Sequence, residues 1–235
     1  MAKKERPIIF GAGMVRALLD GRKTQTRRVI KPDIVGNMDI PRGQGDVDAG
    51  CPYIETENGM MSVKDLCHYG QPGDILWVRE TWSEYDCLDG DADNYSVAVC
   101  YKASYSEFTY GSAEDQGAVI WFDSDRETFE VYKQKIEGYE VFGEKWNPPI
   151  YMPKKFARIW LEITDIRVER VQDISEEDAQ AEGCVNDVRL ISDEKAYYGF
   201  YAQERFELLW DSVNAKLGHP WESNPWVWVI KFRRR

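Results

Sequence analysis

The segment from Gly21 to Arg28 reads Gly-Arg-Lys-Thr-Gln-Thr-Arg-Arg and combines side chains that proton-transfer chemistry requires. It places the hydroxyl groups of Thr24 and Thr26 among one lysine and three arginines. A hydroxyl is a weak nucleophile until a base removes its proton, and Lys23 becomes such a base if burial and neighbouring arginines lower its pKa. The alternative is a charged strand edge that faces water, which has the same composition.

Lys23 and Thr26 can meet only if the chain departs from a regular strand between them. In an extended strand, side chains alternate, so positions 23 and 26 point to opposite faces. A turn or bulge at Lys23 would bring the two together, and Gly21 favours one because glycine adopts backbone conformations that other residues avoid. The sequence therefore predicts a distorted start to this strand.

The elements expected around this segment indicate an α+β fold centred on a small, mostly antiparallel β-barrel. A long strand is expected over 157–171, and its apolar alternation changes phase, which predicts a bulge near Asp165. Ser175-Glu-Glu-Asp178 resembles a capping box and predicts a short helix that stops at Gly183. The other expected strands cover 7–10, 23–30, 75–79 and 226–232, and the other expected helices cover 14–19 and 194–217.

The helix expected over 194–217 carries an apolar stripe, which predicts that one face of it is buried. The stripe consists of Phe206, Leu209, Trp210, Val213 and Leu217. Two regions show no such pattern. Residues 31–69 read as a loop-rich excursion, and residues 83–150 as an irregular acidic segment with strand-like pieces at 97–101 and 118–122.

Several stretches of the chain resemble the ASCH family of PUA-like domains. The family signature Gly-x-Lys-x-x-Thr-x-Arg falls on Gly21, Lys23, Thr26 and Arg28. The family's other strands and its small helix are similar to Gly73-Asp-Ile-Leu-Trp-Val, Trp160-Leu-Glu-Ile-Thr-Asp-Ile, Asp173-Ile-Ser-Glu-Glu-Asp-Ala-Gln-Ala-Glu182 and Trp228-Val-Ile-Lys-Phe. The resemblance implies one domain made of residues 1–82 and 151–235, interrupted by an acidic insertion at 83–150.

In particular, the chain is similar to small bacterial ASCH proteins that hydrolyse N4-acetylcytidine to cytidine and acetate. The resemblance implies catalytic roles for Lys23, Thr26 and Glu182, and substrate contacts from Gly21, Thr24, Arg27 and Arg28. Hydrolysis of an amide needs a nucleophile, a base that activates it and an acid for the leaving amine. Glu182 ends the expected short helix, where the helix dipole raises the pKa of a carboxyl group and so favours proton donation. The alternative for Glu182 is an ordinary solvated helix end.

Other functions fit the same resemblance. The chain is also similar to longer ASCH proteins encoded by phages and prophages. Because PUA-like barrels bind RNA, the basic strand with Arg27 and Arg28 is alternatively part of an RNA-binding module or a ribonuclease. Single-stranded RNA and a modified nucleoside are therefore the two expected partners.

The net charge of −11 comes almost entirely from one segment. From Glu84 to Lys145 there are 15 acidic and 5 basic residues, whereas the rest of the chain has 26 acidic and 25 basic ones. The overall acidity argues against unspecific binding of duplex DNA, which depends on Lys and Arg. The acidic segment is a candidate docking site for a basic protein partner, and deletion of residues 84–145 would test that role.

The sequence predicts no metal ion and no cofactor. Cys51, Cys67, His68 and Cys87 lack Cys-x-x-Cys spacing, and the chain has only two histidines. It has no P-loop, no Gly-x-Gly-x-x-Gly run and no Ser-His-Asp arrangement. Five scattered cysteines, no apolar run near the roughly 18 residues of a membrane span and no apolar leader predict a cytoplasmic protein without a membrane segment.

Overall fold

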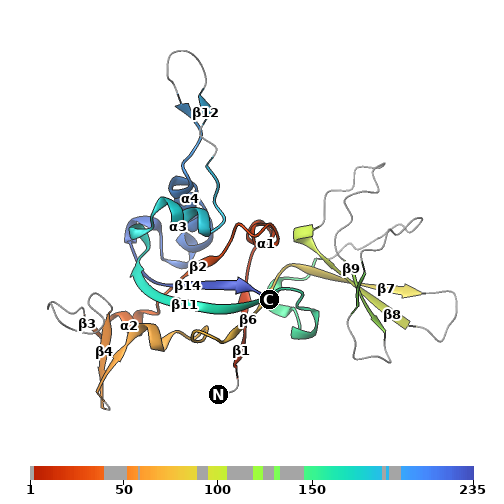
Figure 1. Cartoon of the computed structure of the whole chain (residues 1–235), viewed down its shortest axis with the longest axis horizontal. Helices are drawn as coiled ribbons and strands as arrows, with labels where there is room; N and C mark the ends of the chain where they lie inside the picture. The colour runs from red at the N-terminus through yellow and green to blue at the C-terminus, as the bar shows by residue number, and fades with distance from the viewer. Residues whose placement is uncertain are drawn as a thin grey trace. The chain divides into compact units, whose positions relative to one another are not determined.

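Figure 1 shows a computed structural model of the chain, which describes residues 3–39, 52–57, 59–88, 95–104, 119–123, 130–132, 146–186, 189–190 and 197–235. The fold is mixed α+β, with a mostly antiparallel sheet and few helices, which confirms the predicted class. The chain divides into two compact units. The first contains Met1–Arg6, Ala17–Leu76 and Trp160–Arg235, and the second contains Pro7–Arg16 and Trp77–Ile159.

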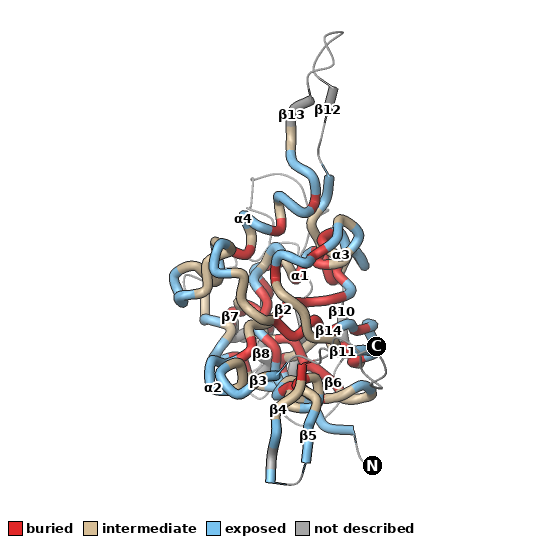
Figure 2. The backbone as a smooth tube through the Cα atoms, turned by 90° about the vertical axis from the view of Figure 1, so that its left-hand side faces the viewer, coloured by how far each residue is buried: buried red, intermediate tan, exposed pale blue. Residues whose placement is uncertain are grey.

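The first unit is built on three antiparallel strands, β11 (Trp160–Arg170), β14 (Trp226–Arg234) and β2 (Gln25–Val29). Two strands that continue into the second unit, β6 (Ile75–Arg79) and β1 (Glu5–Ile9), complete the order β1-β6-β11-β14-β2. Among the described strands, β1 and β2 stand at opposite ends of this order, so the described sheet is not a closed barrel. Most of β2 and β14 is buried (Figure 2).

The bulge that the sequence predicts in β11 is present. The pairing of β11 with β14 shifts register between Ile163 and Asp165. Side chains alternate along a strand, and the extra residue at the shift allows both Ile163 and Ile166 to be buried. The prediction of a bend near Asp165 is confirmed.

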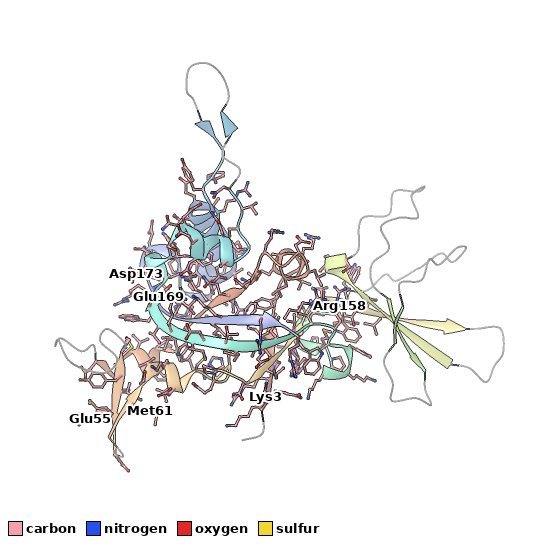
Figure 3. The ribbon with its side chains drawn as sticks, in the orientation of Figure 1. Lys3, Glu55, Met61, Arg158, Glu169 and Asp173 are labelled. Atoms are coloured by element: carbon pink, nitrogen blue, oxygen red, sulfur yellow. The ribbon has the colours of Figure 1, made fainter. Side chains whose placement is uncertain are left out.

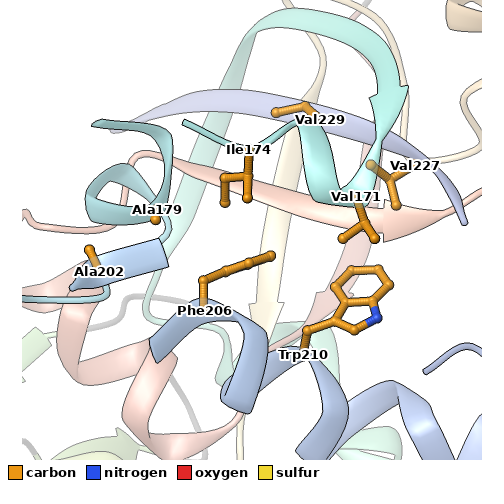
Figure 4. Close-up of a cluster of buried hydrophobic side chains, with 8 residues drawn as sticks. All are labelled: Val171, Ile174, Ala179, Ala202, Phe206, Trp210, Val227 and Val229. Carbon is orange, nitrogen blue, oxygen red and sulfur yellow. The ribbon is translucent and has the colours of Figure 1, made fainter. Parts of the chain in front are cut away.

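A hydrophobic cluster joins two helices of the first unit to the sheet (Figure 4). Helix α3 (Glu176–Ala181) begins after Ser175, whose hydroxyl accepts a hydrogen bond from the Asp178 N–H at 3.1 Å, so the predicted cap is confirmed. Helix α4 (Ala202–Asn214) supplies the largest side chains. The cluster contains Val171, Ile174, Ala179, Ala202, Phe206, Trp210, Val227 and Val229.

Helix α4 is shorter than the sequence predicts. It begins at Ala202 instead of Glu194, because Glu204 accepts a hydrogen bond from the Tyr201 N–H at 2.8 Å and fixes the helix start there. Residues 191–196 lie outside the described part of the chain, and β13 (Tyr197–Tyr198) pairs with β12 (Arg189–Leu190). The predicted stripe is buried only at Phe206 and Trp210, since Val213 and Leu217 are 45% and 69% exposed.

The region 31–69, predicted as loop-rich, contains regular structure. After the short helix α2 (Pro32–Val35), the strands β3 (Met38–Asp39), β4 (Tyr53–Thr56) and β5 (Gly59–Ser62) form a three-stranded sheet. Residues 40–51 and 58 lie outside the described part of the chain. These strands are only two to four residues long, which is too short for hydrophobic alternation to reveal them.

The second unit contains a four-stranded sheet in the order β10-β9-β8-β7. Its strands are β7 (Trp82–Leu88), β8 (Tyr95–Tyr101), β9 (Val119–Asp123) and β10 (Glu130–Tyr132). The strand-like pieces predicted at 97–101 and 118–122 fall on β8 and β9, although Ala118 lies outside the described residues. Arg158, labelled in Figure 3, pairs with the buried Glu80 through contacts of 2.8 and 2.9 Å.

The remaining helices are short apart from α1 (Ala12–Leu19), which runs from the second unit into the first. The single-turn 3-10 helices are η1 (Val63–Leu66), η2 (Lys102–Ser104), η3 (Pro149–Tyr151), η4 (Lys154–Phe156), η5 (Val171–Asp173), η6 (Ala215–Leu217) and η7 (Trp221–Ser223). None of the helices in the described residues combines the length and apolar character that crossing a membrane requires.

Candidate functional site

The candidate site lies where the start of β2 meets the end of α3. Lys23 forms an isolated antiparallel bridge with Glu182, and the Thr24 N–H donates to the Ala181 carbonyl at 2.8 Å. Two residues further on from Lys23, the Gln25 amide donates to the Asp178 carbonyl at 3.0 Å. Side chains alternate along a strand, so Lys23, Gln25 and then Arg27 all point toward α3.

Lys23 and Glu182 form a buried ion pair. The Lys23 Nζ lies 2.7 Å from Glu182 Oε2 and also donates to the Glu182 carbonyl at 2.9 Å. The two side chains are 1% and 3% exposed. Burial lowers the pKa of Lys23 below its usual value, the Glu182 carboxylate opposes that shift, and the Arg28 cation adds to it. Burial therefore disfavours the ammonium form of a lysine that lies in direct contact with a carboxylate.

Arg27 holds the other oxygen of the same carboxylate. Its Nη1 lies 3.2 Å from Glu182 Oε1, and its Nη2 lies 3.0 Å from Asp178 Oδ2. The same guanidinium contacts Glu169, a residue of β11 that is labelled in Figure 3. The Arg27 side chain is 0% exposed, so the charge of its guanidinium is neutralised by carboxylates and not by water.

A second arginine closes the network on the side of β11. The Arg167 Nε lies 2.9 Å from Glu169 Oε2, and the Arg167 guanidinium also contacts Asp178. Arg27 and Arg167 thus share two carboxylates, which fixes the side chain of Asp178 on α3. Coulombic attraction to Arg167 and a hydrogen bond from Arg27 outweigh the effect of burial and lower the pKa of Asp178.

Glu182 is not the solvated helix end that the sequence left open as an alternative. It is the C-cap of α3, its side chain is buried, and each of its carboxylate oxygens accepts from a different cation. Glu182 therefore contacts Lys23 and Arg27 instead of facing water.

Thr26 points to the opposite face of β2. It pairs across the strands with Ile230, whereas Arg27 pairs with Val229, which belongs to the cluster beneath α3 and α4. The turn lies at Gly21, whose φ is +74°. Lys23 forms an isolated bridge, and β2 itself begins only at Gln25. The structure brings Lys23 and Glu182 together and leaves Thr26 on the other side of the strand.

The structure places the four residues expected to contact substrate in different environments. Arg27 is buried among carboxylates, so it positions Glu182 instead of facing a substrate. Arg28 is partly exposed on the Thr26 face and donates to the Arg27 carbonyl at 3.3 Å. Gly21 and Thr24 are exposed, and the Thr24 carbonyl accepts from the Phe232 N–H at 2.9 Å.

Sequence reasoning missed four residues of the network, namely Gln25, Arg167, Glu169 and Asp178. The alternation of Lys23, Gln25 and Arg27 was a signal that these three share a face. Nothing in the spacing placed β11 beside α3. Two further neighbours of Lys23 follow Glu182 directly: Gly183, with φ +96°, and Cys184, whose thiol pKa burial raises to about 11.

The described residues contain no group of three or more His, Cys, Asp or Glu side chains that could hold a metal ion. In comparisons with known proteins, no family model and no solved structure matches the chain. The contacts of Lys23, Arg27 and Glu182 are therefore the basis for assigning a function.

Proposed function

We propose that the chain hydrolyses an acyl amide on a modified cytosine nucleoside of the N4-acetylcytidine type. The observation that supports this is the buried Lys23–Glu182 pair, with 2.7 Å between amine and carboxylate. Burial lowers the pKa of Lys23, which favours the neutral amine that a general base requires. In the proposed reaction Lys23 is the base and the Glu182 carboxyl group is the acid, as amide hydrolysis requires.

The proton balance of this reaction closes within the pair. The neutral Lys23 amine removes a proton from a water molecule as its oxygen attacks the acyl carbon. When the C–N bond breaks, the Glu182 carboxylic acid gives its proton to the leaving exocyclic nitrogen. Cytidine and a carboxylic acid leave, and the ammonium–carboxylate pair is restored for the next cycle.

Water is the nucleophile in this proposal because Thr26 points away from Lys23. The resemblance to ASCH amidohydrolases instead gave the Thr26 hydroxyl that role. Thr26→Val removes the hydroxyl and keeps the shape of this buried side chain. Activity that survives in Thr26→Val supports attack by water, whereas loss of activity with an unchanged melting temperature would return the nucleophilic role to Thr26.

The decisive experiment follows the release of cytidine and acetate from N4-acetylcytidine by chromatography. We expect Lys23→Met and Glu182→Gln each to lower kcat about 100-fold or more, since each removes one partner of general acid–base catalysis. Lys216→Met, which changes an exposed lysine of η6, is the matched control and should retain full activity. A folded wild-type protein with no turnover would overturn the proposal and leave the pair a structural role.

We also propose that the first unit is the PUA-like, ASCH-type domain. Support comes from the positions of three resembling stretches, since Trp160–Ile166 and Trp228–Phe232 lie on neighbouring strands of one sheet and Gly21–Arg28 leads into the next strand, β2. In such a domain a second function, RNA binding, is favoured by one observation. Arg28 lies on the face of β2 that α3 does not occupy.

A further inference from the structure

Six charged side chains of the first unit form one continuous network around the candidate site. Each contact in it joins a cation to a carboxylate, and the contacts run from the Lys23–Glu182 pair through Arg27 to β11 and α3. Three cations and three carboxylates take part, so the network as a whole carries no net charge. Its members are Lys23, Arg27, Arg167, Glu169, Asp178 and Glu182.

The network has a buried half and an outer half that differ in charge. The buried half has two cations and one carboxylate, and the side chains of Lys23, Arg27 and Glu182 are 1%, 0% and 3% exposed. The outer half has two carboxylates and one cation, and the side chains of Glu169, Asp178 and Arg167 are 18%, 23% and 30% exposed. The negative excess of the outer half therefore compensates the positive excess of the buried half.

Arg27 connects the two halves through the two ends of one rigid group. Its Nη1 lies 3.2 Å from Glu182 Oε1, and its Nη2 contacts both carboxylates of the outer half. A guanidinium is planar, so its orientation is fixed once Nη2 is held. The outer carboxylates thereby direct Nη1 to one oxygen of Glu182 and leave the other oxygen, Oε2, to Lys23 at 2.7 Å.

The outer half also determines the electrostatic potential at the buried pair. Two cations beside one carboxylate are unfavourable in the interior unless further negative charge compensates them. Glu169 and Asp178 supply that charge from partly exposed positions, and Arg167 offsets part of it. Loss of an outer carboxylate should make the surroundings of the pair more positive, and loss of Arg167 should make them more negative.

We propose that Glu169, Asp178 and Arg167 are positioning residues of the proposed hydrolysis, which act through Arg27 on the Lys23–Glu182 pair and fix the pH range in which it works. The catalytic part of this inference rests on the proposed function. The pair exchanges its protons as a unit, because its two groups are in direct contact. More positive surroundings weaken proton binding to the pair and move its working range to lower pH, whereas more negative surroundings move it to higher pH.

Other charged or titratable groups also surround the pair. Arg28 of β2 and Cys184, which follows α3, act on it directly. Arg22 donates to the Gly183 carbonyl at 2.8 Å, and Arg205 of α4 acts on Cys184. These groups are the same in all the variants compared below, so a difference between variants reports the outer half alone.

The first test is the pH dependence of kcat/KM for the release of acetate from N4-acetylcytidine by the full chain. Glu169→Gln and Asp178→Asn each remove one negative charge and should move both limbs of the profile to lower pH by about 0.5–1 unit. Arg167→Gln removes a positive charge and should move both limbs to higher pH by a similar amount. A merely structural role would lower kcat/KM without shifts of opposite sign, and two carboxylate variants are used in case one fails to fold.

Glu162→Gln is the matched control for Glu169→Gln. Both glutamates lie on β11, their side chains are 15% and 18% exposed, and each pairs with two cations. The partners of Glu162 are Lys3 and Arg233, which lie outside the network, so this replacement should leave the profile unchanged. The double variant Glu169→Gln/Arg167→Gln removes one charge of each sign and should return the profile toward that of the wild type.

A second measurement does not depend on turnover. The carbon NMR signal of the Lys23 Cε, assigned by its absence in Lys23→Met, reports the protonation of the amine as pH changes. Its midpoint should move down in Glu169→Gln and up in Arg167→Gln even if N4-acetylcytidine is not a substrate. Opposite shifts without turnover would therefore refute the proposed function and support the role of the outer half. Midpoints that stay fixed, that move in the same direction in both variants, or that move equally in Glu162→Gln would overturn the inference.

Discussion

At the scale of single residues, Arg27 is the side chain on which the site depends most. Its fully buried side chain contacts Glu182, Asp178 and Glu169. Its guanidinium carbon also lies 5.6 Å from the centroid of the Phe206 ring. Removing one partner from a buried ion network leaves the remaining charges without compensation, which is far more destabilising than the loss of a surface pair.

Replacement of Arg27 by methionine should therefore lower the free energy of unfolding by about 3–5 kcal/mol. Arg22→Met is the matched control, because Arg22 forms a surface pair with Asp20 at 2.7 Å and should change stability by about 0–1 kcal/mol. Urea denaturation of both variants measures the difference. Equal losses would show that the buried network contributes no more than a surface contact.

The lowered pKa of Lys23 predicts how the free energy of unfolding changes with pH. Its pKa in the folded protein is below the value of 10.5 expected for the unfolded chain. Between these two values the unfolded state binds more protons than the folded state, so stability rises with pH across this window and levels off above 10.5.

The measurement compares the free energy of unfolding of the wild type and of Lys23→Met from neutral to alkaline pH. The difference between them isolates Lys23 from other titrating groups and should change in favour of the wild type as pH rises. A difference that is independent of pH, or that falls, would mean that the charged ammonium is well accommodated in the folded state.

At the same scale, sequence reasoning found the two partners of the central pair and not the residues that hold them. Lys23 and Glu182 were chosen from a family resemblance, and the structure places them in contact. Glu169, on a strand, and Asp178, on a helix, could not be identified from the sequence. No local pattern shows that the same arginine contacts both carboxylates. These two residues come close only when the folded chain brings β11 next to α3, and no residue spacing in a single sequence reveals that arrangement.

At the scale of elements, the contact between α1 and the end of α3 has no room for a side chain at residue 183. A Cβ on Gly183 would lie 2.7 Å from the Cβ of Ala17, and its φ is +96°. Lys23 is the next neighbour, with its Cβ at 3.4 Å. This close approach holds the backbone of Glu182 against Lys23.

Gly183→Ala should accordingly destabilise the protein, and Gly218→Ala supplies a matched control. Gly218 also has a positive φ, +87°, but a methyl group added there would meet no atom within 4 Å, so both variants share the backbone strain and differ in the clash. The clash should make Gly183→Ala less stable than Gly218→Ala by about 1–3 kcal/mol in thermal or urea denaturation. A second change, Ala17→Gly, should restore part of that loss, and equal stability of the two single variants would contradict the close packing.

The elements themselves were predictable where patterns were strong. The alternation of β11 and β14 and the Ser175 cap gave correct strands, a correct bulge and a correct helix start. The turn expected at the start of this strand is found at Gly21, and β2 begins only at Gln25, after the isolated bridge of Lys23. The expected start of α4 was wrong, since Glu204 supplies a cap that the apolar stripe does not reveal.

At the scale of the whole molecule, the two units differ in how much of them the sequence could predict. The first unit has long strands with buried side chains, and its sheet follows from apolar alternation. The second unit has a core of Trp82, Val99, Tyr101, Met152 and Phe156, which are too dispersed along the chain to form a periodic pattern. The partner proposed for the acidic segment stays a prediction, because most of residues 105–145 lie outside the described part of the chain.

The alternation of side chains along β2 has a consequence for how this protein can evolve. Odd-numbered positions, with Lys23, Gln25 and Arg27, belong to one face, and even-numbered positions, with Thr26 and Arg28, belong to the other. A substitution therefore alters one face and spares its opposite. Insertion or deletion of a single residue in β2 would move every following side chain to the other face of the strand. The length of β2 should therefore be conserved even at positions where a substitution is tolerated.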